Sequence, residues 1–354
     1  MGRRAKAGTL ASELVALAVP LLHQAERCCP RTGRGDKPDI PDWLMAGLIM
    51  VALLHKKKTK SAQFRFLRQR QAEVGRWLGC PRFPSRATYF RRYRRAHRLY
   101  AGAVRLQGQA AIAEGLVDPA VVAVDKSLVA ARGTPWHLSD RRAGKAPAGV
   151  DTEAAWCQSQ HDGWVYGYSF EVVVSATPGA LVFPLLASTD VASAGETKSF
   201  VAKVAQLPDQ TRAVLADCGY DSNALAERVE YDADDRRTGR RFLCPQNPRN
   251  TVGRKLKAPS SAAEAKRRQR RTQRQRHLKS RRGRRLFRRR SKTAEPFNQW
   301  FKALFELDER VWHRGLANNR TQIIGAIFVY QLLVRHNHRR GRSNGQIRWI
   351  LDSL

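Results

Sequence analysis

Several common patterns are missing from this sequence of 354 residues, and each absence argues against a class of protein. The six cysteines form no C-x-x-C pair and do not alternate with histidines at zinc-binding spacing, which favours reduced, intracellular thiols. The longest apolar run, Trp43 to Leu54, is too short to cross a bilayer. We therefore expect a buried helix in this run and no membrane partner.

Nucleotide-driven motors and serine hydrolases are also disfavoured. The stretch from Gly195 to Ser199 contains a lysine and a serine but lacks the G-x-x-x-x-G-K-[ST] frame that cradles phosphates, and no G-x-S-x-G occurs. The N-terminus has a basic end and an apolar run like a signal peptide, but Glu13 interrupts the run and no clean cleavage site follows. We expect a helix there, and a cytoplasmic protein.

Acidic residues are scarce relative to basic ones. The chain has 65 Lys and Arg against 30 Asp and Glu, a formal net charge of +35. A surface with this charge attracts polyanions in a salt-dependent way, so nucleic acid is the expected partner. About half of the excess lies in Arg254 to Lys292, where Glu264 is the only acid. Such a basic segment, residues 254–292, predicts either a flexible arm or a helix laid on a polyanion.

Residues 1–115 have apolar side chains at helical spacing and predict an all-helical DNA-binding domain. Residues 8–24, 41–55 and 61–78 are the first expected helices. A basic helix then follows Pro84 and Ser85, which form a plausible N-cap. Its arginines, among them Arg86, Arg91 and Arg95, suit phosphates and guanine edges, as in a helix-turn-helix. A solvated basic face is the alternative for this helix.

From residue 119 onward, short β-rich runs alternate with polar turns and helices. Strands are expected at 120–124, 164–176, 181–187, 212–216 and around Phe242, and helices at 195–207 and 222–231. This pattern predicts an α/β domain with a mixed sheet flanked by helices. After the basic segment come two further helix patterns, Glu295 to Val311 and Asn318 to Asn337, and then a basic tail over 336–354.

Two aspartates stand directly after apolar strand runs: Asp125 in VVAVDKS and Asp217 in AVLADCGYDS. A buried carboxylate is costly unless a cation or hydrogen bonds compensate it, and a divalent metal is an economical solution for two of them. Gly219 would allow a tight turn, and Asp221 or Ser222 would cap the next helix. Each aspartate alone could also be an ordinary strand-end residue.

The third acid is Glu295, at the start of EPFNQWFKALFELDERV. Glu295 and Lys302 are seven residues apart, which places them on the same face of a helix. A carboxylate for a metal and a lysine for a phosphate would then point into one groove. The alternative is an ordinary surface pair.

These residues resemble the DDE transposases of bacterial insertion sequences, whose catalytic core is RNase H-like. Asp125 resembles the first aspartate of that family, LADCGYDS resembles its second-aspartate motif around Asp217, and Glu295 with Lys302 resembles its E-x6-K helix. The likeness covers about residues 119–335, interrupted by the basic segment 254–292. Where the family has an arginine four residues before the glutamate, this chain has Ser291, so Arg289 or Arg290 would have to supply that group.

The resemblance implies a transposase that binds terminal inverted repeats, cuts there and joins the freed 3′-OH to target DNA. Asp125, Asp217 and Glu295 would hold two Mg²⁺ or Mn²⁺ ions. Lys302, together with Arg289 or Arg290, would contact double-stranded DNA, and the protein would act as a homodimer or higher assembly in the bacterial nucleoid. Two alternatives are an inactive, transposase-derived DNA-binding protein and an RNA-binding protein, although the latter does not explain the acid-ended strands.

Overall fold

The computed structural model describes residues 2–29, 39–80, 82–159, 162–251, 258–342 and 347–354. Six helices precede the sheet: α1 (Gly2–Cys28), α2 (Asp42–Leu54), α3 (Lys60–Gln69), α4 (Gln71–Leu78), α5 (Arg86–Tyr93) and α6 (His97–Ala113). The apolar run expected to be a buried helix is α2, whose residues from Leu44 to Leu54 are all buried. No helix in the described part of the chain is both long and apolar enough to span a membrane.

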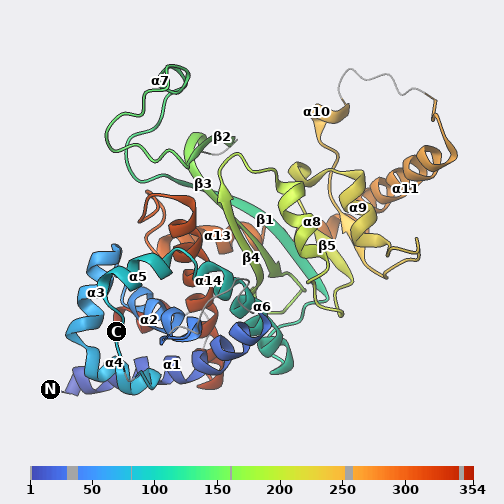
Figure 1. Ribbon diagram of the computed structural model, residues 1–354. Coiled ribbons are helices and arrows are strands. Elements are labelled where there is room, and N and C mark those ends of the chain that lie inside the picture. Colours follow the sequence, from blue (N-terminus) through green and yellow to red (C-terminus); the bar gives the residue numbers. More distant parts are fainter. Residues whose placement is uncertain (1, 30–38, 81, 160–161, 252–257, 343–346) are drawn as a thin grey trace.

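A mixed six-stranded sheet forms the centre of the fold (Figure 1). Its strands are β1 (Val121–Ala130), β2 (Ala155–Ser159), β3 (Gly163–Ser175), β4 (Pro184–Val191), β5 (Ala213–Leu215) and β6 (Arg241–Leu243). The order is β2-β3-β1-β5-β6, and β4 pairs with β3. β3 runs antiparallel to β1, β2 and β4, whereas β1, β5 and β6 are parallel.

Helices cover both faces of this sheet. The helices that follow β1 in the chain are α7 (Leu138–Arg142), α8 (Glu196–Val204), α9 (Asn223–Glu230), α10 (Pro248–Thr251), α11 (Ala262–Lys279), α12 (Arg281–Phe287), α13 (Ala294–Leu304), α14 (Leu316–Arg339) and α15 (Ile347–Asp352), with a 3₁₀ turn, η1 (Cys218–Tyr220), after β5. Consecutive residues of a strand point to opposite faces. Phe170 packs on Phe301 of α13, whereas Glu171 binds Lys203 of α8, so α13 and α8 lie on opposite faces.

The N-terminal helices gather around α14, which is buried over most of its length (Figure 1). Buried polar side chains tie these parts together. The Gln331 side-chain amide donates to the backbone carbonyls of Val104 on α6 and Pro184 on β4, at 2.9 and 2.7 Å. Tyr93 of α5 and His313 are also hydrogen-bonded, 2.9 Å apart. The helical N-terminus, the mixed RNase H-like core and the helical C-terminus agree with the predicted fold class.

Several predicted boundaries were wrong. The expected helix over 61–78 is broken at Arg70 into α3 and α4. The helix expected to reach Val311 ends at Leu304, because Glu306 adopts a left-handed backbone with φ of 52°. β4 begins at Pro184 rather than Leu181, and β2 was not predicted.

Asp125 was expected at the end of its strand but lies in the middle of β1. The strand continues to Ala130 because β3 is long enough to supply a partner for every residue of this extension. Of the segment expected to be a basic tail, residues 336–339 belong to α14. The helix α15 follows, with Ile347, Ile350 and Leu351 buried.

Candidate active site

Asp125 and Asp217 lie side by side because of the register of the parallel strands. Ala123 of β1 aligns with Leu215 of β5, and both aspartates stand two residues further along. Residues that are aligned on parallel strands point to the same face. Asp217 follows the end of β5 in an extended conformation and caps η1, where its Oδ1 accepts from the Gly219 N–H at 2.9 Å. The strand-to-turn junction therefore fixes this carboxylate.

Glu295 is joined to Asp125 by an arginine. Arg290 Nη2 lies 2.7 Å from Glu295 Oε1, and Arg290 Nη1 lies 3.2 Å from Asp125 Oδ1. Asn298, one turn after Glu295 on α13, donates to the other oxygen of Asp125 at 2.9 Å. The sequence analysis did not single out Asn298. Asn298 is three residues after Glu295, and this spacing alone predicts that both side chains lie on the same face of the helix.

The pKa of Asp125 shows how tightly these groups are placed. This pKa is raised to about 7. Burial is the largest cause, the charge of Arg290 acts in the opposite direction, and the charges of Asp217, Glu295 and Glu196 contribute to the rise. Asp125 is only 8% exposed. The four carboxylates therefore form one electrostatic cluster, and Glu196 at the start of α8 is a member that sequence analysis missed.

Lys302 is half-buried on α13, on the helix face predicted for it. Burial lowers its pKa, and the charges of Asp162, Asp308 and, to a smaller extent, Asp125 act against this shift. Arg289 is not among the bonded partners of the carboxylates. Its guanidinium donates to the backbone carbonyls of Ala176 and Thr177 at 3.3 and 3.5 Å.

The other predicted DNA contacts lie far along the chain from the carboxylates, on and just after α5. Ser85 caps α5 as predicted, accepting from the Thr88 N–H at 3.2 Å. Tyr89 and Tyr93 are fully buried and anchor the helix. Arg86, Arg91 and Arg95 are exposed. DNA binding by these three arginines remains a prediction.

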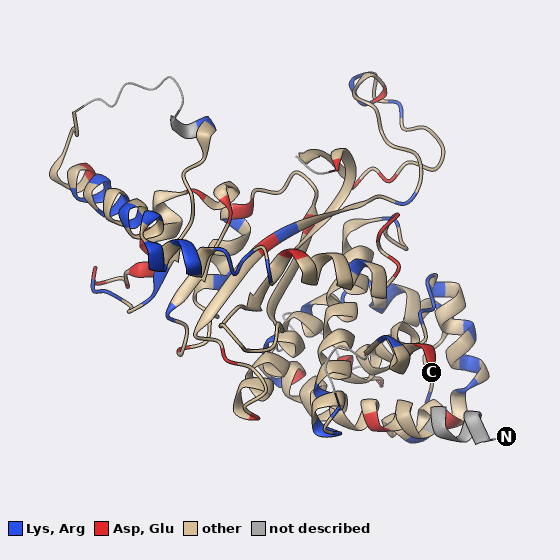
Figure 2. Ribbon diagram, turned by 180° about the vertical axis from the view of Figure 1, so that it is seen from behind, with Lys and Arg blue, Asp and Glu red and all other residues tan. Residues whose placement is uncertain are grey.

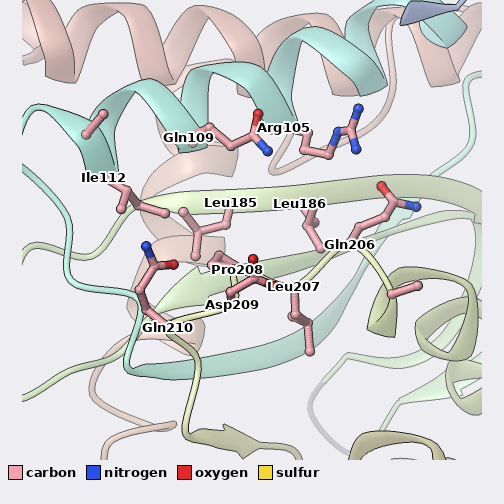
Figure 3. A pocket seen from close by; sticks show the side chains of 13 residues that line it. Arg105, Gln109, Ile112, Leu185, Leu186, Gln206, Leu207, Pro208, Asp209 and Gln210 are labelled. Carbon is pink, nitrogen blue, oxygen red and sulfur yellow. The ribbon is translucent and has the colours of Figure 1, made fainter. Parts of the chain in front are cut away.

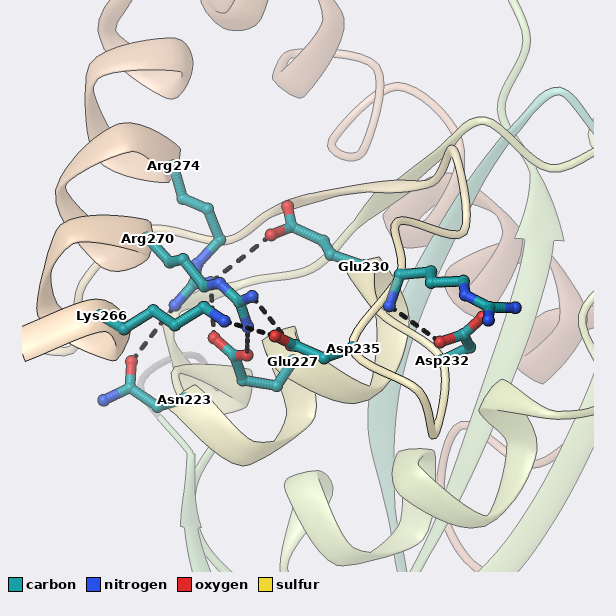
Figure 4. A network of polar contacts seen from close by, with 9 residues as sticks. Asn223, Glu227, Glu230, Asp232, Asp235, Lys266, Arg270 and Arg274 are labelled. Atoms are coloured by element: carbon teal, nitrogen blue, oxygen red, sulfur yellow. Dashed lines mark hydrogen bonds and ion pairs between the residues drawn. The ribbon is translucent and has the colours of Figure 1, made fainter. Parts of the chain in front are cut away.

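The described part of the basic segment is helical rather than extended, and α11 lies on acidic side chains of the same chain (Figure 4). Arg270 pairs with Glu227 and with Asp235, the latter at 2.8 Å. Arg274 pairs with Glu230 at 3.4 Å. Lys and Arg side chains otherwise occupy much of α11 and of the short helix after it (Figure 2). The helical alternative thus holds for residues 262–279, and residues 254–257 lie outside the described residues.

No three His, Cys, Asp or Glu side chains of the described residues converge closely enough to hold a metal ion. The chemistry of the donors still suits one, because carboxylate oxygens are the ligands that Mg²⁺ and Mn²⁺ prefer. Asn298 Oδ1 adds a buried oxygen without a hydrogen-bond partner. In this structure Arg290 supplies the positive charge between Asp125 and Glu295.

A cavity of about 400 Å³ lies elsewhere, between α6, β4 and the loop over 205–210 (Figure 3). Its walls are mainly leucine, glutamine and alanine, with Arg105 and Asp209 as the charged residues. None of the predicted site residues lines it. We therefore place the candidate site at the carboxylates.

The mixed sheet with helices on both faces is an RNase H-like fold. Residues 117–332, more than half of the chain, match the family model described as "Transposase DDE domain", and the chain belongs to that family. Among solved structures, the chain is similar to a piggyBac transposase synaptic complex with hairpin DNA. The identity is 10% and the TM-score 0.37, over 98% of this chain and 78% of that one. No curated protein matches.

Proposed function

We propose that this chain is an active transposase of a bacterial insertion sequence, which binds terminal inverted repeats and cuts and joins DNA strands at Asp125, Asp217 and Glu295. The observation that carries the proposal is that Arg290 bridges Asp125 of β1 and Glu295 of α13, while the register of β1 and β5 places Asp217 at the same edge of the sheet. Membership of the Transposase DDE domain family supports the reaction class.

Different residues have different roles in the proposed reaction. Asn298 and η1 orient the carboxylates of Asp125 and Asp217. Two Mg²⁺ or Mn²⁺ ions, when bound, would activate the attacking hydroxyl and stabilise the leaving oxygen. Lys302 is suited to a backbone phosphate beside the cluster because it lies seven residues after Glu295 on α13 and therefore on the same helix face.

Exposed basic side chains lead from α12 toward Glu295 and would neutralise phosphates of double-stranded DNA: Arg281, Arg282, Arg284, Arg285, Arg288 and Lys292. Arg86, Arg91 and Arg95 offer a second basic surface for the terminal repeat. Two ends must be held together for joining, so we propose a homodimer or higher assembly on DNA in the bacterial cytoplasm.

The test uses purified chain, Mg²⁺ and a duplex that carries the inverted repeats flanking its gene. Asp217→Asn should lower strand cleavage by about 100-fold or more, since the metal contribution is worth several kcal/mol. DNA binding in a gel-shift assay should change little. Asp234→Asn, at an exposed aspartate remote from the cluster, is the matched control. Undiminished nicking by Asp217→Asn would contradict the proposal.

A second candidate is a DNA-binding derivative that does not cut. The bonds of Arg290 to Asp125 and Glu295 favour it, because they occupy oxygens that a metal would need. This candidate predicts specific binding to the repeats with no Mg²⁺-dependent cleavage by the unaltered chain.

A further inference from the structure

The first residue of α8, Glu196, reaches the acidic cluster from the face of the sheet opposite α13. Phe170 and Glu171, which are neighbours on β3, contact α13 and α8 respectively, and this places the two helices on opposite faces. β5 ends at Leu215, so the chain beyond it, which carries Asp217, no longer pairs with β1. Glu196 and Asp217 approach each other at this edge of the sheet.

The space beside Gly219 shows how close the two carboxylates are. A Cβ on residue 219 would lie 1.8 Å from Glu196 Oε2 and 3.0 Å from Asp217 Oδ1. Both oxygens therefore border one small volume beside Gly219. Gly219 lies in the tight turn η1, as expected, but its φ is not positive, so a larger residue here would act by displacing the Glu196 carboxylate.

Glu196 is held in this position by a buried network at the far end of α8. Glu196, Ser199 and Lys203 share one helix face by their spacing. Lys203 Nζ and Ser199 Oγ both donate to Oε1 of Glu171, the latter at 3.0 Å. Tyr220 of η1 donates to the other oxygen of Glu171 at 2.9 Å. The network thus joins α8 to the turn that carries Asp217.

The start of α8 is fixed as well. Lys126, which follows Asp125 on β1, points to the face of α8 and donates to the carbonyls of Ala192 and Ala194, at 2.9 and 2.7 Å. These residues lead directly into the helix. The helix that carries Glu196 is therefore fixed by contacts before its first residue and along its length. This is the arrangement expected of a helix that must hold a functional side chain in one position.

Two carboxylates this close repel each other unless a cation or a proton lies between them. An independent feature of the same cluster also points to a ligand. Asn298 is only 5% exposed, its amide nitrogen binds Asp125, and its Oδ1 is buried without a partner. A buried acceptor left open beside a carboxylate cluster is suited to a cation or to water bound to one.

We propose that Glu196 is a fourth acidic residue of the metal site and shares with Asp217 the Mg²⁺ or Mn²⁺ ion that this aspartate holds. The inference rests on the proposed function in its choice of metal, but its test does not depend on cleavage. Metal affinity can be measured on the full chain in the absence of DNA.

The experiment titrates Mn²⁺ into the full chain and measures the free ion by electron paramagnetic resonance. Glu196→Gln should weaken binding by about tenfold or more, a typical loss when a group that supports a metal site is removed. Glu309→Gln, at an exposed glutamate, should leave binding unchanged. Gly219→Ala provides a second variant, because its methyl group would displace the Glu196 carboxylate and weaken Mn²⁺ binding without removing an acid. Circular dichroism checks that each variant is folded.

Equal Mn²⁺ affinity in Glu196→Gln, Gly219→Ala and the unaltered chain would overturn the inference, as would the absence of Mn²⁺ binding by the unaltered chain. Cleavage assays separate this failure from failure of the proposed function. If cleavage requires Asp217 but both Glu196→Gln and Gly219→Ala bind Mn²⁺ and cut normally, only the role of Glu196 is wrong. If the unaltered chain does not cut but Glu196→Gln binds Mn²⁺ weakly, the metal site stands without the transposase activity.

Discussion

Arg290 binds Asp125 through one guanidinium nitrogen, 3.2 Å from Oδ1, and uses the other nitrogen for Glu295. The bond joins Arg290, which lies just before α13, to the middle of β1, and the two residues are 165 positions apart in the chain. Of Arg289 and Arg290, the two candidates that the sequence offered, Arg290 is the one bonded to these carboxylates, and contact of either arginine with DNA stays a prediction. The bond also means that a metal ion and the guanidinium would compete for the same carboxylate oxygens.

Replacement of Arg290 should therefore strengthen metal binding. A hydrogen bond to a charged group contributes about 1.5 to 3 kcal/mol, so Arg290→Gln should bind Mn²⁺ about tenfold more tightly or better. Calorimetric titration of the full chain checks this. Arg289→Gln is the matched control, because Arg289 binds backbone carbonyls and not the carboxylates. Weaker Mn²⁺ binding in Arg290→Gln would show that the arginine supports the site instead.

Asn298 should act by orienting Asp125. Asn298→Leu removes the 2.9 Å hydrogen bond to Oδ2 while keeping a branched side chain of similar length, so strand cleavage should fall by about tenfold or more with little change in DNA binding. Gln299→Leu, at the exposed neighbouring position of α13, should cut normally. The assay compares single-turnover cleavage rates at saturating DNA. Unchanged rates in Asn298→Leu would remove Asn298 from the site.

The sequence predicted the acids better than it predicted what surrounds them. Asp125 and Asp217 follow apolar strand runs, and this local signal is visible without a structure. Their alignment depends on β1 and β5 being adjacent and parallel, which a strand pattern alone does not specify. Glu196 gave no signal, because the role that we propose for it depends on its approach to Asp217 across the fold. The extension of β1 beyond Asp125 likewise depends on the length of its partner β3.

The structure of the basic segment could not be predicted from the sequence either. Its composition permits either a flexible arm or a helix. The helix forms in this structure where acidic partners lie on α9 and the loop after it. Those partners are separated from α11 by some 30 to 50 residues of sequence, for example 43 between Glu227 and Arg270. Charge complementarity at that distance is visible only once the fold is known.

The acidic partners of α11 should control its exposure. The double variant Glu227→Gln/Glu230→Gln removes two of the three carboxylates that pair with Arg270 and Arg274 and leaves only Asp235, so the like charges within α11 oppose the helix more strongly. Limited trypsin digestion should cut within residues 266–279 several-fold faster than in the unaltered chain. Glu309→Gln is the control. Identical digestion rates would show that α11 does not depend on these ion pairs.

The buried pair of Glu171 and Lys203 should matter most when it is broken on one side. Glu171 is 3% exposed and Lys203 is 6% exposed. Lys203→Met leaves an uncompensated buried carboxylate and should lower the free energy of unfolding by about 3 to 5 kcal/mol. Adding Glu171→Gln should recover part of this loss. Urea denaturation of both variants checks it, and a double variant less stable than Lys203→Met would contradict the argument.

His313 should make stability fall in acid. Burial lowers its pKa to about 3, and the charges of Lys60 and Arg132 act in the same direction. Between that value and the ordinary pKa near 6.5, the unfolded chain binds a proton on this residue and the folded chain does not. The contribution of His313 is thus fully present above pH 6.5 and falls by about 1.4 kcal/mol per pH unit below it.

His313→Gln should reduce this dependence, although it also alters the 2.9 Å contact with Tyr93 and so lowers stability at every pH. The informative quantity is the slope of the unfolding free energy between pH 7.5 and 5, measured by urea denaturation. His55 and His97, whose pKa values are also lowered by burial, remain in both proteins, so the difference in slope isolates His313. His23→Gln, at an exposed histidine, is the control. Parallel slopes in His313→Gln and the unaltered chain would mean that the folded protein accommodates the charged imidazole.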